Sequence, residues 1–205
     1  MWAYVKDGAI KQTNILQTKL EINPGSYFPV KYANEWTKDE KEAYGVYEIV
    51  SDTTNYKNPD YYQNTSSTLT FSGGVVKETW GTSTARKLGD TNWTQAEIDA
   101  GKAPSGADTD TVNLRGLTYQ HKKRVSTQAH ALLESSDWYA SRKAEAGTAI
   151  PSAIATYRAA VRTKAGQMET LIGNADTVAK LEALYVYNTD NPPTRPLGEW
   201  PDPVE

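Results

Sequence analysis

Residues 133–162 read LESSDWYASRKAEAGTAIPSAIATYRAAVR, and this stretch predicts two helices that meet at a tight corner. Ser136 and Asp137 are good helix N-caps, because their short side chains accept hydrogen bonds from the free N–H groups of a first turn. Gly147 can end the first helix, and Pro151 suits the first turn of the second. We therefore expect Asp137 to cap a short helix that turns back into a longer one.

The longer helix is expected to span 152–172 and to end at Gly173. Apolar residues recur along it at three- and four-residue spacing, which places them on one helix face. The members of this face are Ile154, Tyr157, Val161, Ala165, Met168 and Ile172. We expect Trp138, as the first residue of the short helix, to be buried against Tyr157 or Val161.

Residues 111–134 predict a long helix whose apolar stripe needs a partner, and the helix at 152–172 can supply it. The stripe consists of Leu114, Leu117, His121, Val125, Gln128 and Leu132. A shorter helix is expected at 178–184. Residues 188–205 are rich in proline, which suits neither a helix nor a central strand. We expect an extended tail there, with Trp200 docked on the N-terminal β domain or on a partner.

The first 90 residues predict a small, mainly antiparallel β domain. The pair Asp-Gly at 7–8 favours a two-residue turn, so residues 2–13 are expected to form a β-hairpin. The pair Gly-Gly at 73–74 separates two β-prone runs and predicts a second hairpin. Further strands are expected at 27–30 and 45–50.

Two capping boxes predict short helices, because a Thr and the Glu three residues later can each bind the other's backbone N–H. They begin at Thr37 and Thr94. Residues 101–110 are rich in Gly, Pro, Ser and Asp and predict a flexible linker. The expected fold class is α+β, in four parts: a β domain at 1–90, a short helix and linker at 91–110, a helical domain at 111–187 and an extended tail at 188–205.

The composition argues against several classes of protein. No cysteine is present, which excludes disulfides, thiolate nucleophiles and cysteine zinc sites. The formal charge of −3 gives no global attraction to nucleic acid or to an anionic membrane. No apolar run approaches the roughly 20 residues that cross a bilayer, and the N-terminus lacks a signal-peptide core. We expect a soluble, unexported protein that needs no cofactor and binds neither nucleic acid nor membrane.

The ionisable residues do not predict a catalytic or metal site. His121 and His130 are nine residues apart on one predicted helix, so they face opposite sides and cannot hold one metal ion together. Ser126, His130 and Asp137 form a triad only on paper, since no nucleophile-elbow sequence accompanies them. We expect no catalytic residue, and a protein that is not an enzyme.

Acidic, aromatic, arginine and proline residues form a pattern from position 137 to position 201. They are Asp137, Trp138, Arg142, Ile150, Pro151, Tyr157, Arg158, Val161, Arg162, Trp200 and Pro201. This pattern resembles the bacteriophage tail assembly chaperone (tail fibre assembly) family, most specifically over 132–172. Residues 1–88 are similar only in layout to the N-terminal halves of marine-phage members. The resemblance implies a non-enzymatic protein that helps tail fibres fold, assemble or attach.

The resemblance also implies a partner, a tail fibre or distal tail protein, met in the host cytoplasm during phage assembly. The residues expected to bind it are Trp138, Arg142, Arg158, Arg162, Trp200 and Pro201. An internal role stays open for Arg158 and Arg162, which could pair with Asp137 or Glu145 instead of a partner's carboxylates. A homo-oligomer is also an option. The alternative function is a structural adaptor or fibre-associated subunit retained in the virion tail, and a glycan hydrolase ranks third.

Overall fold

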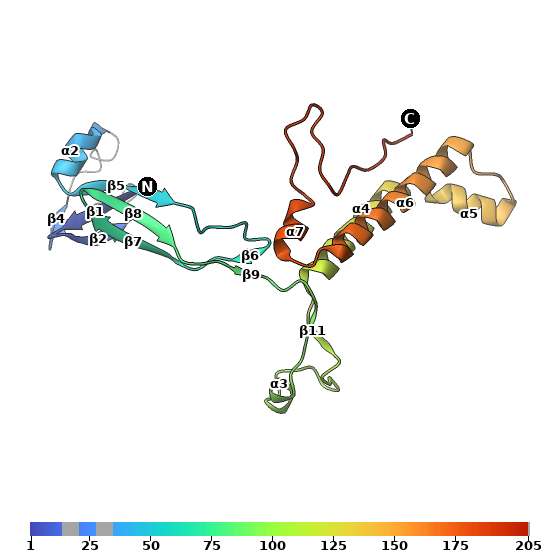
Figure 1. Cartoon of the computed structure of the whole chain (residues 1–205), viewed down its shortest axis with the longest axis horizontal. Coiled ribbons are helices and arrows are strands. Elements are labelled where there is room, and N and C mark those ends of the chain that lie inside the picture. Colours follow the sequence, from blue (N-terminus) through green and yellow to red (C-terminus); the bar gives the residue numbers. More distant parts are fainter. Residues whose placement is uncertain (14–20, 28–34, 205) are drawn as a thin grey trace. The chain divides into compact units, whose positions relative to one another are not determined.

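The computed structural model describes residues 1–13, 21–27 and 35–204. The chain forms two compact units, Met1–Thr84 and Ala85–Glu205, which are described separately here. The first unit contains a five-stranded, mostly antiparallel sheet, and the second contains the long helices (Figure 1). The mixed α+β class expected from the sequence is confirmed. The division between the units lies a few residues before the expected end of the β domain at 90.

The sheet of the first unit has the strand order β2-β1-β5-β8-β7. Its strands are β1 (Trp2–Lys6), β2 (Ala9–Thr13), β5 (Val46–Asp52), β7 (Ser67–Ser72) and β8 (Val75–Trp80). Neighbours pair antiparallel except β5 and β8, which are parallel. The parallel pair arises because β8 reaches β5 through the β7–β8 hairpin. The two edge strands, β2 and β7, also contact each other, so the sheet is strongly curled.

Both predicted hairpins are present, and their turns explain the sequence preference. Asp7 and Gly8 have positive φ angles of 54° and 73°, and Gly73 and Gly74 have 58° and 78°. Two successive residues with positive φ are the requirement of a type I′ turn, which matches the twist of the flanking strands. These two dipeptides therefore set the register of β1 with β2 and of β7 with β8.

The core of this unit lies on the inner face of the curled sheet. Ala3, Val5, Ile49 and Val76 are buried there, and Ile10, Tyr47, Leu69 and Phe71 pack against them. Alternate residues of a strand point to opposite faces, which explains why every second residue of these strands enters the core. Tyr47 and Phe71 bring their ring centroids within 4.7 Å across two strands. The aromatic residues thus help to fill a small β core.

Helix α2 (Lys38–Ala43) carries the predicted capping box of Thr37 and Glu40, and Gly45 follows its end with φ 81°. Four short strands form two further pairs: β3 (Glu21–Asn23) with β4 (Ser26–Tyr27), and β6 (Tyr62–Gln63) with β9 (Thr84–Ala85). The strand expected at 27–30 overlaps β4 at one residue, and its remaining positions lie outside the described residues.

The second unit is built on helices α4 (Leu117–Glu134) and α6 (Ser152–Asn174), which lie side by side (Figure 1). Apart from Arg158, the buried residues of these helices and of α7 (Val178–Ala183) follow the predicted stripes: Leu117, His121, Val125, Val161, Met168, Ile172, Val178 and Leu181. Helix α6 continues past Gly173, which was expected to end it. A Cβ at Gly173 would lie 2.9 Å from Nζ of Lys122 on α4, which is the flexible end of a side chain.

Helix α4 begins later than the predicted residue 111, because the preceding residues form strand β11 (Val112–Leu114). This strand pairs with β10 (Thr91–Asn92). Gly116 then occupies the N-cap position of α4, where a Cβ would overlap the backbone of Leu88 and Gly89. The backbone N–H of Gly116 donates to Asp90 Oδ1 at 2.8 Å. The start of α4 is thus fixed by a segment that lies about 26 residues earlier in the chain.

The expected linker at 101–110 is a series of hydrogen-bonded turns, between α3 (Gln95–Asp99) and β11. The capping box of Thr94 and Glu97 is present as predicted. Lys102 N–H donates to the carbonyl of Glu97, and Thr111 Oγ1 donates to Asp108 Oδ1 at 2.7 Å. Gly, Asp and Thr in this segment form local turns, and the pairing of β10 with β11 brings the two ends of the segment together.

Candidate functional site

Helix α5 (Asp137–Ala146) buries none of its residues, in contrast to α4, α6 and α7 of the same unit. It connects the end of α4 to the start of α6 and ends at Gly147, as predicted, with φ 67°. Trp138 is 51% exposed, so the prediction that its ring is buried against Tyr157 or Val161 was wrong. The indole instead stacks on its sequence neighbour Tyr139, a contact that needs no burial in the helical core.

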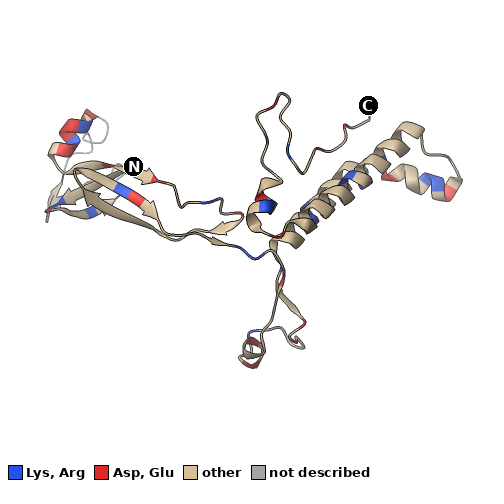
Figure 2. Cartoon of the chain, viewed as in Figure 1, with Lys and Arg blue, Asp and Glu red and all other residues tan. Residues whose placement is uncertain are grey.

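Three side chains of α5 form a group that we call the α5 cluster: Trp138, Tyr139 and Arg142. The indole and phenol rings stack with their centroids 3.9 Å apart and their planes at 28°. The Arg142 guanidinium carbon lies 4.8 Å from the Trp138 ring centroid and 5.4 Å from that of Tyr139. At these distances a cation is attracted to the negative faces of the rings. The α5 cluster is therefore an exposed aromatic surface that carries a positive charge; Figure 2 shows basic residues on α5.

The first turn of α5 is held by Arg158 of α6, which is only 5% exposed. Arg158 Nη1 donates to the carbonyl oxygen of Leu133 at 3.0 Å and to Ser136 Oγ at 2.6 Å. Arg158 Nη2 donates to Asp137 Oδ1 at 2.8 Å, in a charge-assisted bond. One buried guanidinium thus joins the last turn of α4 to the first turn of α5.

This arrangement corrects the predicted cap of α5. The helix begins at Asp137, and Ser136 is its N-cap residue, but neither side chain caps the first turn. Ser136 Oγ donates to the carbonyl of Leu133 at 2.9 Å, and the Asp137 carboxylate binds Arg158. Both residue types are good N-caps, but Arg158 donates hydrogen bonds to Ser136 Oγ and Asp137 Oδ1, and these oxygen atoms do not cap the helix. The internal pairing of Arg158 with Asp137, which was left open, is therefore the one that forms.

The six residues expected to bind a partner do not form one site. Trp138 and Arg142 lie together in the α5 cluster, whereas Arg158 is buried beneath the corner. Arg162 is exposed on α6 and makes no ion pair with the described part of the chain. Tyr139 completes the α5 cluster and was not among the predicted residues. Helix spacing did not predict this contact, because residues i and i+1 do not normally share a helix face. The only sequence signal for Tyr139 was that it follows Trp138 directly.

Trp200 contacts α4 of its own unit. Its indole Nε1–H donates to Gln128 Oε1 at 3.2 Å, and both Trp200 and Pro201 are half-buried. The tail before it is folded by local hydrogen bonds: Asn188 N–H donates to the carbonyl of Thr194 at 2.8 Å. The tail contains no helix or strand over 188–204, and it turns back onto its own helical unit.

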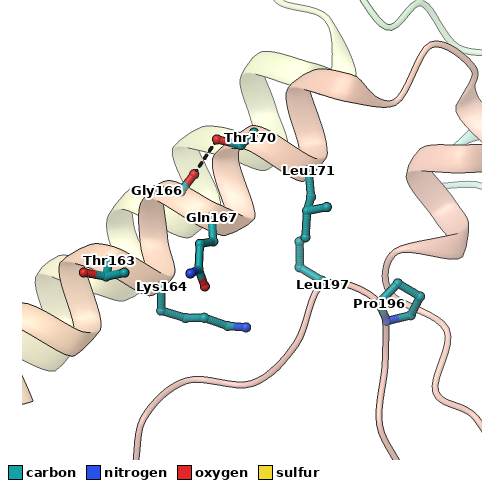
Figure 3. Close-up of a pocket in the computed structure, with 8 residues that line it drawn as sticks. All are labelled: Thr163, Lys164, Gly166, Gln167, Thr170, Leu171, Pro196 and Leu197. Carbon is teal, nitrogen blue, oxygen red and sulfur yellow. Dashed lines mark hydrogen bonds between the residues drawn. The ribbon is translucent and has the colours of Figure 1, made fainter.

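The tail and α6 together form an open groove of about 700 Å³ (Figure 3). Its lining residues are Thr163, Lys164, Gly166, Gln167, Thr170, Leu171, Pro196 and Leu197. Leu197 is buried, and its N–H donates to the carbonyl of Leu184 at 3.0 Å, which joins the tail to the C-terminal end of α7. Sequence reasoning missed this groove, because the lone Leu197 among prolines gave no periodic signal.

The two histidines of the helical unit differ in burial and in their contacts. His121 is buried, and its Nδ1 lies 2.7 Å from the Tyr185 hydroxyl oxygen, in agreement with the expectation of a helix-packing residue. Burial raises the pKa of Tyr185 above its usual value, against the opposing effect of Arg124 and Arg195. His130 is exposed. Within the described residues, no three His, Asp or Glu side chains are grouped as metal ligands would be.

What the α5 cluster offers chemically is apolar surface, two stacked rings and a cation. No helix in the described part of the chain is long and apolar enough to cross a membrane. Comparisons with protein-family models, with curated proteins and with solved structures gave no match to this chain.

Proposed function

We propose that this chain is a non-enzymatic bacteriophage tail fibre assembly protein, which binds a tail fibre or distal tail protein through the α5 cluster. The resemblance of residues 132–172 to that family supplies the biological role. The observation that carries the binding surface is that α5 displays Trp138 at 51% exposure and buries none of its residues. The protein would act in the host cytoplasm while tails are being built.

The exposure of α5 has an energetic consequence that supports a binding role. Isolated helices shorter than about 12 residues are marginal in water, and most helices gain their stability from a packed apolar face. Helix α5 has ten residues and no such face. An aromatic residue can bury roughly 150–250 Å² on contact with another surface. A partner that covers Trp138 and Tyr139 would therefore supply the packing that α5 lacks.

The α5 cluster also has the composition of an interface hot spot. Tryptophan, tyrosine and arginine are the residue types whose truncation most often costs more than about 2 kcal/mol of binding free energy. Trp138, Tyr139 and Arg142 are one of each. A chaperone of this kind holds a client surface and sets its register, so it needs such adaptable contacts and no catalytic cleft.

A matched pair of substitutions tests this function. Trp138→Ala removes the exposed indole of the α5 cluster, whereas Tyr119→Ala removes an exposed ring of α4 that stacks under Arg115 at 4.4 Å. Affinity-tagged full-length chain would be recovered from infected cells, and co-purified tail fibre and distal tail proteins would be quantified by mass spectrometry. Trp138→Ala is expected to reduce their recovery at least about tenfold, equal to about 1.4 kcal/mol. Tyr119→Ala should leave recovery unchanged.

Two outcomes of this experiment would contradict the proposal. If the wild-type chain recovered no tail fibre or distal tail protein, the assembly role would be wrong. If Trp138→Ala and Tyr119→Ala both recovered as much as the wild type, the partner would bind elsewhere on the chain.

The second candidate function is a structural subunit that stays in the virion tail. The observation that favours it is the separate β unit, Met1–Thr84, which has its own core and is not needed for the α5 cluster. A permanent subunit should bury well above about 2,000 Å² in symmetric contacts, whereas a chaperone must release its client. Mass spectrometry of gradient-purified virions decides between them: a fixed copy number per tail favours the subunit, and absence from virions favours the chaperone.

A further inference from the structure

Arg142 has unused hydrogen-bond donors. Its Nε atom is buried and has no hydrogen-bond partner, and Nε is the only side-chain atom in the described residues with this property. The terminal nitrogens Nη1 and Nη2 make no hydrogen bond within the described residues either, and they are not buried. The terminal nitrogens of the guanidinium group thus remain available as hydrogen-bond donors.

The guanidinium group is also held in one orientation before any ligand arrives. It lies over the stacked Trp138 and Tyr139 rings at 4.8 and 5.4 Å. Arginine stacked on aromatic rings loses less side-chain entropy on binding than a free arginine, because its planar fork is already placed. This preorganisation favours a ligand with two oxygen atoms in a plane.

Three arginines of the helical unit pair with an acidic side chain. Arg158 pairs with Asp137 at 2.8 Å, Arg115 with Asp90 at 2.5 Å, and Arg195 with Glu199 at 2.9 Å. Arg142 has no such partner in the described residues. The nearest acid before it on α5, Asp137, is occupied by Arg158. The positive charge of the α5 cluster is therefore available to a group from outside the chain.

We infer that the α5 cluster binds an Asp or Glu side chain of the partner protein, whose two carboxylate oxygens accept hydrogen bonds from Arg142 Nη1 and Nη2. Residues that flank this acid would pack on Trp138 and Tyr139. The inference rests on the proposed function and names the chemistry of the partner segment. A protein carboxylate is favoured over a nucleic-acid phosphate, because phosphate backbones are bound by groups of cations and this chain has a net charge of −3.

The variants that test this inference separate the positive charge of Arg142 from the two-pronged arrangement of its hydrogen-bond donors. Arg142→Gln removes the charge, Arg142→Lys keeps the charge but lacks the two-pronged donor, and Trp138→Ala removes the ring beneath it. Arg124→Gln is the control, because Arg124 is an exposed arginine of α4 outside the α5 cluster. Capture of the tail fibre or distal tail protein by each full-length variant would be measured as above. Arg142→Gln and Arg142→Lys should each weaken capture about tenfold, and Arg124→Gln less than about twofold.

A direct probe makes the test independent of the partner. The tripeptides Ac-Leu-Glu-Leu-NH2 and Ac-Leu-Gln-Leu-NH2 would be titrated into the isotope-labelled full chain at millimolar concentration, with a short oligonucleotide as a third probe. NMR signals of the Trp138 indole and the Arg142 guanidinium would be followed. The Glu peptide should shift both signals, and the Gln peptide should leave the guanidinium signal in place.

Each other outcome overturns the inference or the proposed function in a recognisable way. Equal shifts with both peptides, or no shift with either, would show that no carboxylate is bound. A larger shift with the oligonucleotide would assign the α5 cluster to phosphate instead. If Trp138→Ala abolished capture while both Arg142 variants captured normally, the proposed function would be supported. The inference that Arg142 binds a carboxylate of the partner would then be wrong. If all four variants captured normally, the proposed binding surface would fall as well.

Discussion

Helices α5 and α6 are consecutive in the chain, yet they are held in place by different interactions. Helix α6 buries Val161, Met168 and Ile172 to within 1% of complete burial against its neighbours. Helix α5 buries nothing and is tied to the unit through Arg158 at its first turn. Apolar packing therefore fixes α6, whereas a polar corner fixes α5.

The difference separates residues that build the fold from residues that are free for other contacts. A large apolar side chain on α6 contributes to folding through burial, at about 25 cal/mol per Å² removed from water. The aromatic residues of α5 remain in water, so most of that contribution is not made within this chain. Their retention at the surface is what makes α5 the candidate binding helix. The following predictions test the contrast, beginning with the largest effect.

Met168→Ala should be the most destabilising of these changes. Met168 is 1% exposed, and its truncation removes buried surface and leaves a cavity between the helices. The expected loss is about 2–5 kcal/mol of unfolding free energy. The measurement is the urea midpoint of the full chain, with Leu171→Ala as the control on the same helix. Leu171 is 37% exposed, so its truncation should cost well under half as much; equal costs would contradict the packing described for α6.

Arg158→Met should have the next largest effect, because it keeps the packed stem but removes the guanidinium from the corner. The carbonyl of Leu133 and the hydroxyl of Ser136 would each lose a donor. A loss of about 2 kcal/mol is expected, in the range for hydrogen bonds to charged groups. Asp137→Asn is the control and should cost less, since Asp137 is half-exposed and water can replace its partner.

The same pair of variants tests how α5 is held. Amide hydrogen exchange should rise over 137–146 in Arg158→Met and remain unchanged in the middle of α6. Uniform exchange along both helices would show that α5 does not depend on the polar corner.

A pH change should weaken the start of α4 by a smaller amount. The Gly116 N–H bound to Asp90, together with the Arg115 guanidinium, lowers the pKa of the Asp90 carboxyl below its usual value. A carboxyl whose pKa is lowered in the folded state stabilises the fold above its unfolded pKa of about 4, and this contribution is lost as the pH falls through the folded pKa. The urea midpoint should therefore fall below about pH 4, and Asp90→Asn should make that fall shallower.

A control for the pH effect is available in the β unit. The ion pair with Lys77 and the hydrogen bonds from Thr54 lower the pKa of Asp52 in the same direction. Asp52→Asn should alter the acid sensitivity of the sheet and leave that of α4 unchanged. Hydrogen exchange measured at pH 5 and pH 3 would distinguish the two units. An Asp90→Asn chain with an unchanged pH profile would show that this carboxylate does not stabilise α4.

Trp138→Ala should have the smallest effect on stability, although it is expected to have a large effect on binding. The indole is half-exposed and contributes only its stacking on Tyr139 and its contact with Arg142. A loss within about 1 kcal/mol is expected, as for an exposed cation–π pair. If the urea midpoint showed a loss comparable with that of Met168→Ala, the indole would be part of the core and α5 would lose its standing as a binding helix.

Much of the local structure was predictable because its causes lie within a few residues. The pairs at 7–8 and 73–74 determined both hairpins through their positive φ angles. Thr37 and Thr94 began helices by binding a Glu three residues later. The apolar spacing along 152–172 identified the buried face of α6, because helix periodicity alone places those residues on one side.

The candidate site was only partly predictable. Trp138 and Arg142 were chosen from the sequence and do lie together, since an i, i+4 spacing brings them to one helix face. The exposure of that face was not foreseen. An aromatic residue after a cap can turn either to the core or to water, and the choice depends on whether another element covers it.

The sequence by itself determined the turns, the capping boxes, the apolar stripes and the α+β class, because each depends on hydrogen bonds or periodicity over a short span. Only the tertiary structure decided that Arg158 occupies the oxygens of Ser136 and Asp137, that Trp200 binds Gln128, and that Asp90 fixes the start of α4. These contacts join residues 22, 72 and 26 positions apart. Such pairs form because helix packing brings their atoms together and burial favours satisfied polar groups, and no local pattern records that choice.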